Sequence, residues 1–143
     1  MAGFKLEKIE NSGGNFDIIE YFPSTANETY TLGEVLTMTS DAMTAAGDDS
    51  DGTQKFICQE AYVAPASGNR KIAVSRILPT KIYRVLSYAD NSSTAIGTLV
   101  TLHTDEAQVT ATSTKGVFEI TDKLGSGAAG TEVLGRFPTA AGR

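Results

Sequence analysis

The chain has 143 residues, of which 41% are hydrophobic, 8% aromatic and 20% charged, and its formal net charge is −5. This length suits one globular domain that buries a core without disulfides or structural metals, and the acidic balance argues against nucleic acid or a membrane surface as a partner, because both attract clustered cations. A single Cys and a single His are present, which excludes zinc sites, since these need three or four such ligands, and also an internal disulfide.

The first residues differ in character from the rest of the chain. Residues 1–10 mix Lys and Glu with apolar residues, so we expect neither a signal peptide nor a membrane-spanning helix there, and synthesis in a reducing cytoplasm. Residues 11–15 are polar and contain two glycines, as in a hinge. We predict a flexible N-terminal arm over 1–15, either a frayed terminus or a segment that adds a strand to a neighbour's sheet, and a single barrel-like domain over 16–143.

The body of the chain has the composition of an all-β protein. Thr, Val and Ile are frequent, and fourteen glycines divide the chain into short segments. We expect strands over 16–22, 30–38, 56–58, 71–78, 82–88, 99–104, 108–112, 117–121 and 132–137. Residues 40–46, closed by Gly47, fit either one helical turn or the arm of a hairpin. Strands of this length and spacing predict a small β-barrel or sandwich.

A ten-residue segment recurs 64 positions later in the chain. Residues 32–41 align with residues 96–105, and the apolar positions coincide. In both copies a glycine precedes an apolar strand that ends in a hydroxyl residue and Asp, a pair that closes turns through side-chain to backbone hydrogen bonds. A further β-segment follows each copy, at 55–58 and 116–120. We therefore predict two similar β-units packed in one barrel-like body, with 72–88 as the connecting pair of strands.

The acidic run Asp48–Gly52 resembles part of a calcium-binding loop. With Gly52 at the invariant glycine position, however, Gly47 would take the first ligand position and Cys58 the bidentate acidic position at the end of the loop. Neither residue supplies a carboxylate. We interpret the run as a solvated hairpin tip.

The segment Gly125–Gly130 matches the glycine pattern of dinucleotide-binding folds. That pattern requires a following helix and, about twenty residues on, an acidic residue, whereas only 13 residues follow Gly130. Thr131 also occupies the place of the lysine that a phosphate-binding loop needs. We interpret the segment as a turn between the last two strands and expect no bound cofactor.

No catalytic arrangement is evident in the sequence. Cys58 lies in an apolar strand, where a thiol usually packs as a small hydrophobic group, and His103 is far away in the chain. No serine follows a nucleophile-elbow pattern and no pair of carboxylates stands out. We expect no catalytic residue and no metal site, and therefore no enzyme.

Positive charge gathers in the centre of the chain, at Arg70, Lys71, Arg76, Lys81 and Arg84. Such residues usually form a solvated strand face. They can instead face an acidic partner, where electrostatics mainly sets register and the rate of association.

The order of segments resembles that of tailed-bacteriophage capsid decoration proteins, also called cement proteins. The resemblance covers most of the chain from about Tyr21 onward. It is carried by strand and turn patterns at 33–36, 43–47, 56–58, 72–79, 82–85, 96–102, 109–112, 116–120 and 135–137. The acidic insertion 48–52 departs from the pattern, being longer than expected there.

The resemblance implies a non-catalytic structural protein on the outer surface of a virion, made in the cytoplasm of the bacterial host. It implies the major capsid protein as partner and a homo-oligomer, with a trimer favoured. We expect contacts to the capsid or to a neighbouring subunit from three apolar arm residues and three arginines: Phe4, Leu6, Ile9, Arg70, Arg76 and Arg84. Removing residues 1–15 should then impair attachment but leave the body folded.

Two other functions remain open at this point. Another phage virion module, such as a tail-tube or head-completion component, shares this composition and number of strands. A small ligand-binding or hydrolytic β-barrel is the second alternative. The sequence also does not separate an SH3-like barrel from the β-tulip fold that some decoration proteins use.

Overall fold

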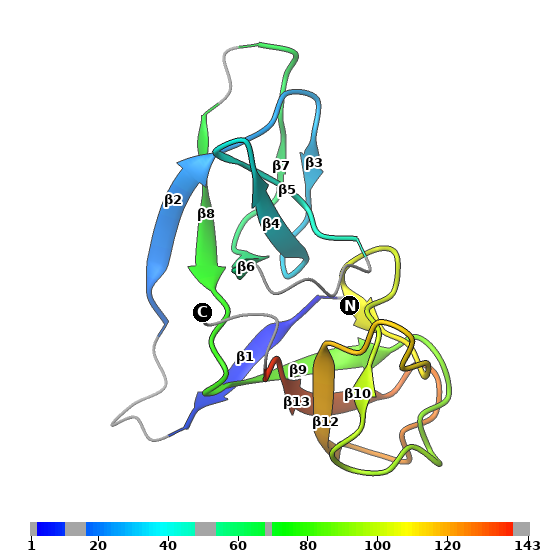
Figure 1. Cartoon of the computed structure of the whole chain (residues 1–143). Coiled ribbons are helices and arrows are strands. Elements are labelled where there is room, and N and C mark those ends of the chain that lie inside the picture. The colour runs from blue at the N-terminus through cyan, green and yellow to red at the C-terminus, as the bar shows by residue number, and fades with distance from the viewer. Residues whose placement is uncertain (1–2, 11–16, 48–53, 68–69, 139–143) are drawn as a thin grey trace.

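The structure is a computed structural model that describes residues 3–10, 17–47, 54–67 and 70–138 (Figure 1). These residues form thirteen β-strands in three sheets, with no helix among them. The predicted all-β class is therefore confirmed. None of the described residues belongs to a helix that could span a lipid bilayer.

The first half of the chain forms a five-stranded antiparallel sheet, in the upper part of Figure 1. In spatial order its strands are β2 (Ile19–Pro23), β8 (Lys71–Arg76), β6 (Lys55–Cys58), β4 (Val35–Thr39) and β5 (Ala42–Ala45). A two-stranded sheet of β3 (Thr29–Tyr30) and β7 (Tyr62–Val63) accompanies it. Tyr30 and Tyr62 pack with the buried cluster around Leu36, Met43 and Phe56, and their rings stack with centroids 6.4 Å apart.

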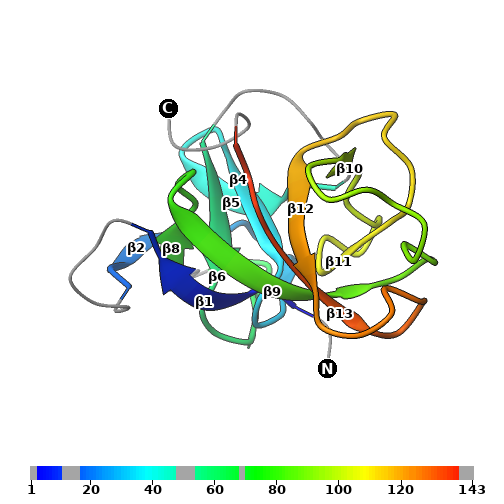
Figure 2. The same ribbon diagram turned by 90° about the horizontal axis from the view of Figure 1, so that it is seen from below.

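The second half forms a six-stranded sheet, to which the N-terminus contributes one strand. The spatial order is β1 (Lys5–Ile9), β9 (Lys81–Ser87), β13 (Glu132–Arg136), β12 (Phe118–Lys123) and β10 (Leu99–Val100), and β11 (Gln108–Val109) also pairs with β9. Figure 2, which looks from below, shows β1 running alongside β9. The larger core lies here, around the rings of Phe118 and Phe137.

Residues 40–46 form the arm of a hairpin. β4 and β5 pair directly, with Met38 opposite Met43 and Thr39 opposite Ala42. The two turn residues have positive φ, 52° at Ser40 and 67° at Asp41. A two-residue loop with both φ values positive matches the right-handed twist of the strands it joins, which explains why a hairpin forms here.

The two halves repeat the same turn. Gly33 and Gly97, which the sequence alignment pairs, have φ of 88° and 95°. Each occupies the third position of a tight turn, where only a residue that tolerates positive φ fits. In the first turn the amide of Gly33 donates to the carbonyl of Cys58 in β6, and the amide of Cys58 donates to the carbonyl of Glu34. In the second turn the amide of Gly97 donates to the carbonyl of Ile120 in β12, and the amide of Ile120 donates to the carbonyl of Thr98.

The repeat extends to the whole topology. The order β2-β8-β6-β4-β5 corresponds to β9-β13-β12-β10 with β11. In the first half β5 returns to the end of β2 through a short parallel contact between Met43 and Ser24. In the second half β11 returns to β9 through a parallel contact between Val109 and Ser87. These contacts are too short to close a barrel. We call the described residues of 17–76 the first unit and those of 81–138 the second unit; the prediction of two similar β-units is confirmed.

The strands of 72–88 do not form a connecting pair. β8 belongs to the first unit's sheet and β9 to the second unit's sheet, joined by residues 77–80. That detail of the prediction was wrong. The alternation of apolar residues identified both strands correctly but carries no information on which strand each one pairs with.

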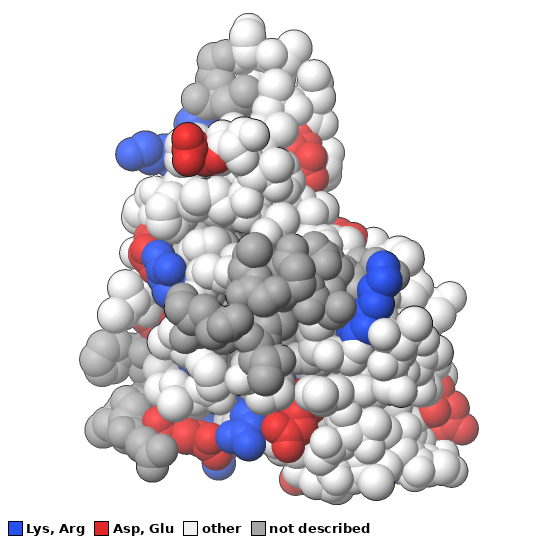
Figure 3. All heavy atoms as spheres, in the orientation of Figure 1, with Lys and Arg blue, Asp and Glu red and all other residues white. Residues whose placement is uncertain are grey.

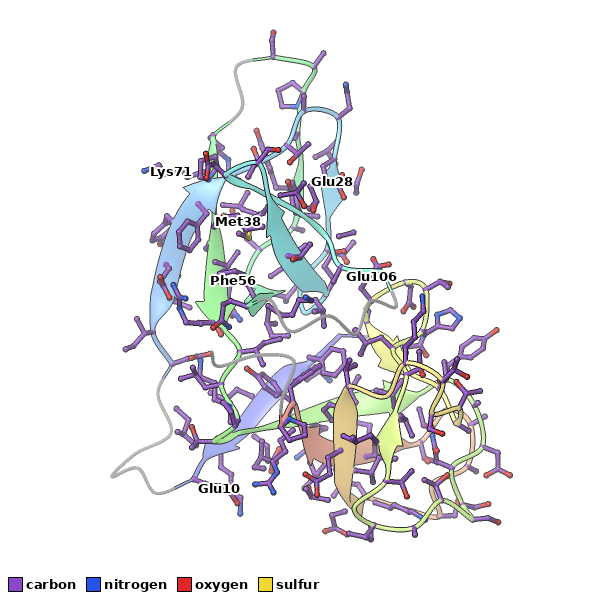
Figure 4. All side chains as sticks on the ribbon, viewed as in Figure 1. Glu10, Glu28, Met38, Phe56, Lys71 and Glu106 are labelled. Carbon is purple, nitrogen blue, oxygen red and sulfur yellow. The ribbon has the colours of Figure 1, made fainter. Side chains whose placement is uncertain are left out.

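Backbone hydrogen bonds join the two units where the N-terminal segment meets them. The amide of Phe4 donates to the carbonyl of Gly33 in the first unit (2.8 Å), and the amide of Gly3 donates to Ala107 in the second (2.8 Å). The amide of Val35 donates to the carbonyl of Glu106 at 2.9 Å, and Figure 4 shows Glu106 at this junction.

Residues 3–10 are therefore part of the body, which corrects the predicted arm for these residues. Phe4 is 3% exposed and lies in the larger core, with its ring centroid 5.4 Å from those of Phe118 and Phe137. Leu6 packs against the same core. Strand β1 pairs antiparallel with β9 along most of its length. The remaining residues of the predicted arm lie outside the described residues.

Candidate functional site

Arg70, one of the predicted contact residues, is held within its own chain. Its Nη2 lies 2.8 Å from Oε1 of Glu60 and its Nη1 lies 3.2 Å from Oε2. The guanidinium also sits over the ring of Tyr62, 3.9 Å from the centroid. The hydrogen bonds from Arg70 lower the pKa of Glu60. Both charges in this pair are therefore balanced before any partner arrives.

Arg76 and Arg84 are engaged in the same way. Arg76 binds Glu20 through Nε at 3.0 Å and Nη2 at 2.9 Å, which lowers the pKa of Glu20. Nη2 of Arg84 lies 2.8 Å from Glu7, and its Nη1 lies 3.5 Å from Glu132. On the face in Figure 3, blue groups at the left and at the bottom lie beside red ones, whereas the blue group at the right stands apart. Contact of these arginines with a capsid stays a prediction.

The three apolar residues predicted to make contacts are in different environments. Phe4 lies in the core, so its side chain is not accessible to a partner, and that expectation is corrected. Leu6 is partly covered by the same core. Ile9, at the end of β1, is half-buried and lines a cavity between the two units. Contact of Leu6 and Ile9 with a partner stays a prediction.

Cys58 and His103 each have partners of their own. The Cys58 thiol is buried and donates to the carbonyl of Glu60 at 2.9 Å, and burial raises its pKa to about 11. His103 stacks on Tyr88 with ring centroids 3.8 Å apart, and its Nδ1 lies 3.2 Å from Asp105. A thiol with this pKa is almost entirely protonated near neutral pH and is a poor nucleophile.

The two loop motifs have different outcomes. The segment Gly125–Gly130 lies between β12 and β13, so its interpretation as a turn is confirmed. The acidic run 48–52 lies outside the described residues. Within the part of the chain that the structure describes, no group of three or more His, Cys, Asp or Glu is placed to hold a metal ion.

The surface feature that stands out is a group of exposed apolar residues in β2 and immediately before it. Nine large apolar side chains are exposed among the described residues, and three of them fall within four positions. These are Ile18 at 70% exposure, Ile19 at 41% and Tyr21 at 61%. Scattered exposed apolar residues are normal on a soluble protein, whereas a group of them marks a contact surface.

A cavity of about 380 Å³ is lined by one member of this group, Ile18. Its apolar lining comes from Ile9, Ile18 and Leu78, which lie at the ends of three different segments, and four charged residues complete it: Asp17, Glu20, Arg76 and Lys81. We call the exposed residues Ile18, Ile19 and Tyr21 and this cavity together the β2 surface.

The charged residues of the β2 surface neutralise one another. Arg76 binds Glu20, as described above, and Nζ of Lys81 lies 2.6 Å from Asp17 with both side chains largely buried. Because each charge has an opposite charge in contact, the β2 surface presents an electrically balanced, apolar patch. Such a patch suits a protein partner better than an anion or a nucleic acid.

Sequence reasoning missed Ile18, Ile19 and Tyr21, although a signal was present. The segment 18–22 is apolar at four of five positions, so both faces of the strand carry apolar residues. Pro23 directly after them favours a position at the edge of a sheet. An edge strand that is apolar on both faces is a candidate for binding another protein.

No protein-family model matches the chain, and no curated protein matches its sequence.

Proposed function

We propose that this protein is a non-catalytic structural component that binds the outer surface of an assembled phage capsid and stabilises it. The observation that carries the proposal is the β2 surface, an apolar and charge-balanced patch on a body whose described secondary structure consists of short paired strands. A surface of this kind binds protein by excluding water from apolar side chains, with complementary shape at its centre.

The two-unit body suits a protein that acts by its shape. Both cores are dense in aromatic and branched aliphatic residues, and the N-terminal segment is hydrogen-bonded to both units. A rigid body loses little conformational entropy when it docks, so more of the contact energy remains as affinity.

The proposed partner is the major capsid protein, and the proposed location is the outer face of the virion after synthesis in the host cytoplasm. A homo-oligomer, favoured as a trimer, would place several copies of the β2 surface on equivalent capsid sites. Multivalent attachment raises the effective affinity of weak single contacts by orders of magnitude.

The test is co-sedimentation with emptied heads of the phage that encodes the chain. Ile18→Lys places a charge in the β2 surface, whereas Val63→Lys makes the same kind of change at an equally exposed residue on β7, since both side chains are 70% exposed. We expect wild type and Val63→Lys to bind heads and Ile18→Lys to lose at least about tenfold in affinity, as for a residue near the centre of an interface.

Two results would contradict the proposal. Failure of the wild-type protein to sediment with heads refutes capsid attachment, and equal binding by both variants refutes the β2 surface as the contact. Electron microscopy of the purified protein separates the alternative of a tail-tube component, because such a component forms rings or tubes by itself.

A further inference from the structure

The internal repeat makes β2 and β9 equivalent strands. In the first unit the amide of Ser24 donates to the carbonyl of Arg70 at 3.1 Å, and in the second the amide of Ser87 donates to Thr131 at 2.9 Å. These serines directly follow the paired residues Pro23–Lys71 and Leu86–Glu132. Each residue of β2 thus has a counterpart 63 positions later in β9.

This equivalence identifies the backbone groups that point away from the sheet. In an antiparallel pair, hydrogen-bonded positions alternate with positions whose amide and carbonyl face the other side. The amide of Ser24 is bonded to β8, so the amides and carbonyls of Phe22 and Glu20, two and four positions earlier, also point toward β8. Those of Ile19 and Tyr21, at the alternate positions, point outward. In β9 the corresponding outward residues are Ile82 and Arg84.

The outer edge of β9 is covered by a strand. β1 pairs antiparallel with it, with Lys5 opposite Arg84 and Lys8 opposite Ile82. At the same edge of β2, none of the described strands pairs with Ile19 or Tyr21, since β2 ends the order of its sheet. The molecule thus contains one edge filled by an extended segment and an equivalent edge that its own described strands leave open.

The side chains show what chemistry each edge accepts. On the β9 edge the pairing is charged, because Arg84 binds Glu7 of β1 at 2.8 Å. The residue of β2 equivalent to Arg84 is Tyr21, which is exposed and uncharged, and the nearby Glu20 and Arg76 already neutralise each other. A strand added to β2 therefore needs apolar, uncharged residues where it faces Ile19 and Tyr21.

We infer that β2 accepts an extended, antiparallel segment of the capsid protein as an additional strand, with apolar residues of that segment facing Ile19 and Tyr21. The inference rests on the proposed function and specifies its contact. Main-chain hydrogen bonds to both outward residues supply affinity, and the apolar side chains set the register. Pro23, which has no amide, limits the new ladder to the residues before it.

The test compares Tyr21→Pro with Tyr21→Val in co-sedimentation with phage heads. Both variants lose the phenol ring, but only proline also lacks the outward amide, and neither removes a hydrogen bond to β8. We expect Tyr21→Pro to bind heads about tenfold more weakly than Tyr21→Val, the effect of losing roughly one well-formed hydrogen bond together with the fit around it. Thermal unfolding of both variants checks that the body is intact.

A second measurement does not depend on a variant that folds. In wild-type protein, the amides of Ile19 and Tyr21 should exchange with solvent rapidly when free and become protected on heads, while those of Glu20 and Phe22 are protected in both states. Strand addition is overturned if the two outward amides exchange equally fast in both states.

The remaining outcomes are distinguishable. Equal binding by Tyr21→Pro and Tyr21→Val also rejects strand addition while capsid attachment stands, whereas no binding by wild type rejects both. A dimer in solution that Tyr21→Pro converts to a monomer assigns the edge to a second copy of this chain and overturns the capsid protein as its occupant.

Discussion

Gly33 and Gly97 offer a matched test of how the N-terminal segment holds the two units together. Both glycines have positive φ in equivalent turns. A Cβ on Gly97 would meet no atom within 4 Å, whereas a Cβ on Gly33 would lie 2.8 Å from Cα of Gly3 and 3.0 Å from the nitrogen of Phe4. Alanine at each position therefore carries the same backbone strain, and only alanine at Gly33 collides with a neighbouring backbone.

The structure sets the expected magnitudes. Positive φ at a residue with a Cβ costs about 1–2 kcal/mol, which is the whole effect expected for Gly97→Ala. In Gly33→Ala the backbone of Gly3 and Phe4 must move, which breaks the hydrogen bond from Phe4 to Gly33 (2.8 Å) and withdraws the Phe4 ring from the core. Loss of a buried phenylalanine costs about 3–5 kcal/mol, so Gly33→Ala should lose several kcal/mol more than Gly97→Ala.

The assay is equilibrium unfolding in urea, with the free energy of unfolding and its denaturant dependence fitted for each variant. The double variant Gly33→Ala with Phe4→Ala adds a control. Since the first substitution already displaces Phe4, the two losses should be clearly less than additive. Equal losses for Gly33→Ala and Gly97→Ala, or full additivity with Phe4→Ala, refutes the assignment of this contact.

Two further predictions concern stability. Phe4→Ala should lower the free energy of unfolding by about 3–5 kcal/mol, measured in urea. Contrary to the expectation from the sequence, removal of residues 3–10 should unfold the body, because Phe4 lies in the core and β1 pairs with β9. A truncated chain with unchanged stability contradicts the place of Phe4 in the core. Burial raises the pKa of the Glu34 carboxyl above its value in the unfolded chain. The free energy of unfolding that the protonated carboxyl allows at low pH is therefore lost as the pH rises from the unfolded pKa through the folded pKa. Glu34→Gln keeps an acceptor for the amide of Thr31 (2.7 Å) and should raise the melting temperature at pH 7, with the gain vanishing below about pH 4; a gain of the same size at both pH values contradicts this cause.

The strands themselves were largely predictable because their signals are local. Apolar alternation and glycine spacing located the segments that became β4, β8 and β9, and the 64-residue offset revealed the repeat. The hairpin at 40–46 stayed open at the sequence level, since a segment this short, with Ser or Asp at its start, fits a helical turn and a hairpin arm equally well. The positive φ of Ser40 and Asp41 decided it.

The candidate site was much less accessible to sequence reasoning. Arg70, Arg76 and Arg84 stand out in the sequence as cations, but a charge acts on a partner only if no carboxylate of the same chain already binds it. Glu20 is 56 positions from Arg76, and Glu7 is 77 positions from Arg84. Pairs at such separations are created by the sheet order, which no local pattern encodes.

The burial of Phe4 was equally hard to predict from the sequence. A short apolar and charged segment before a glycine-rich stretch has the composition of an arm, and it has that composition whether or not a sheet edge exists to receive it. The edge is supplied by β9, more than seventy residues later in the chain. Local alternation of residues dictated that these segments are extended and which side chains share a face. Only the packing of distant strands decided that β1 fills one sheet edge and that the arginines are paired. The same packing decided that Ile19 and Tyr21 of β2 remain exposed.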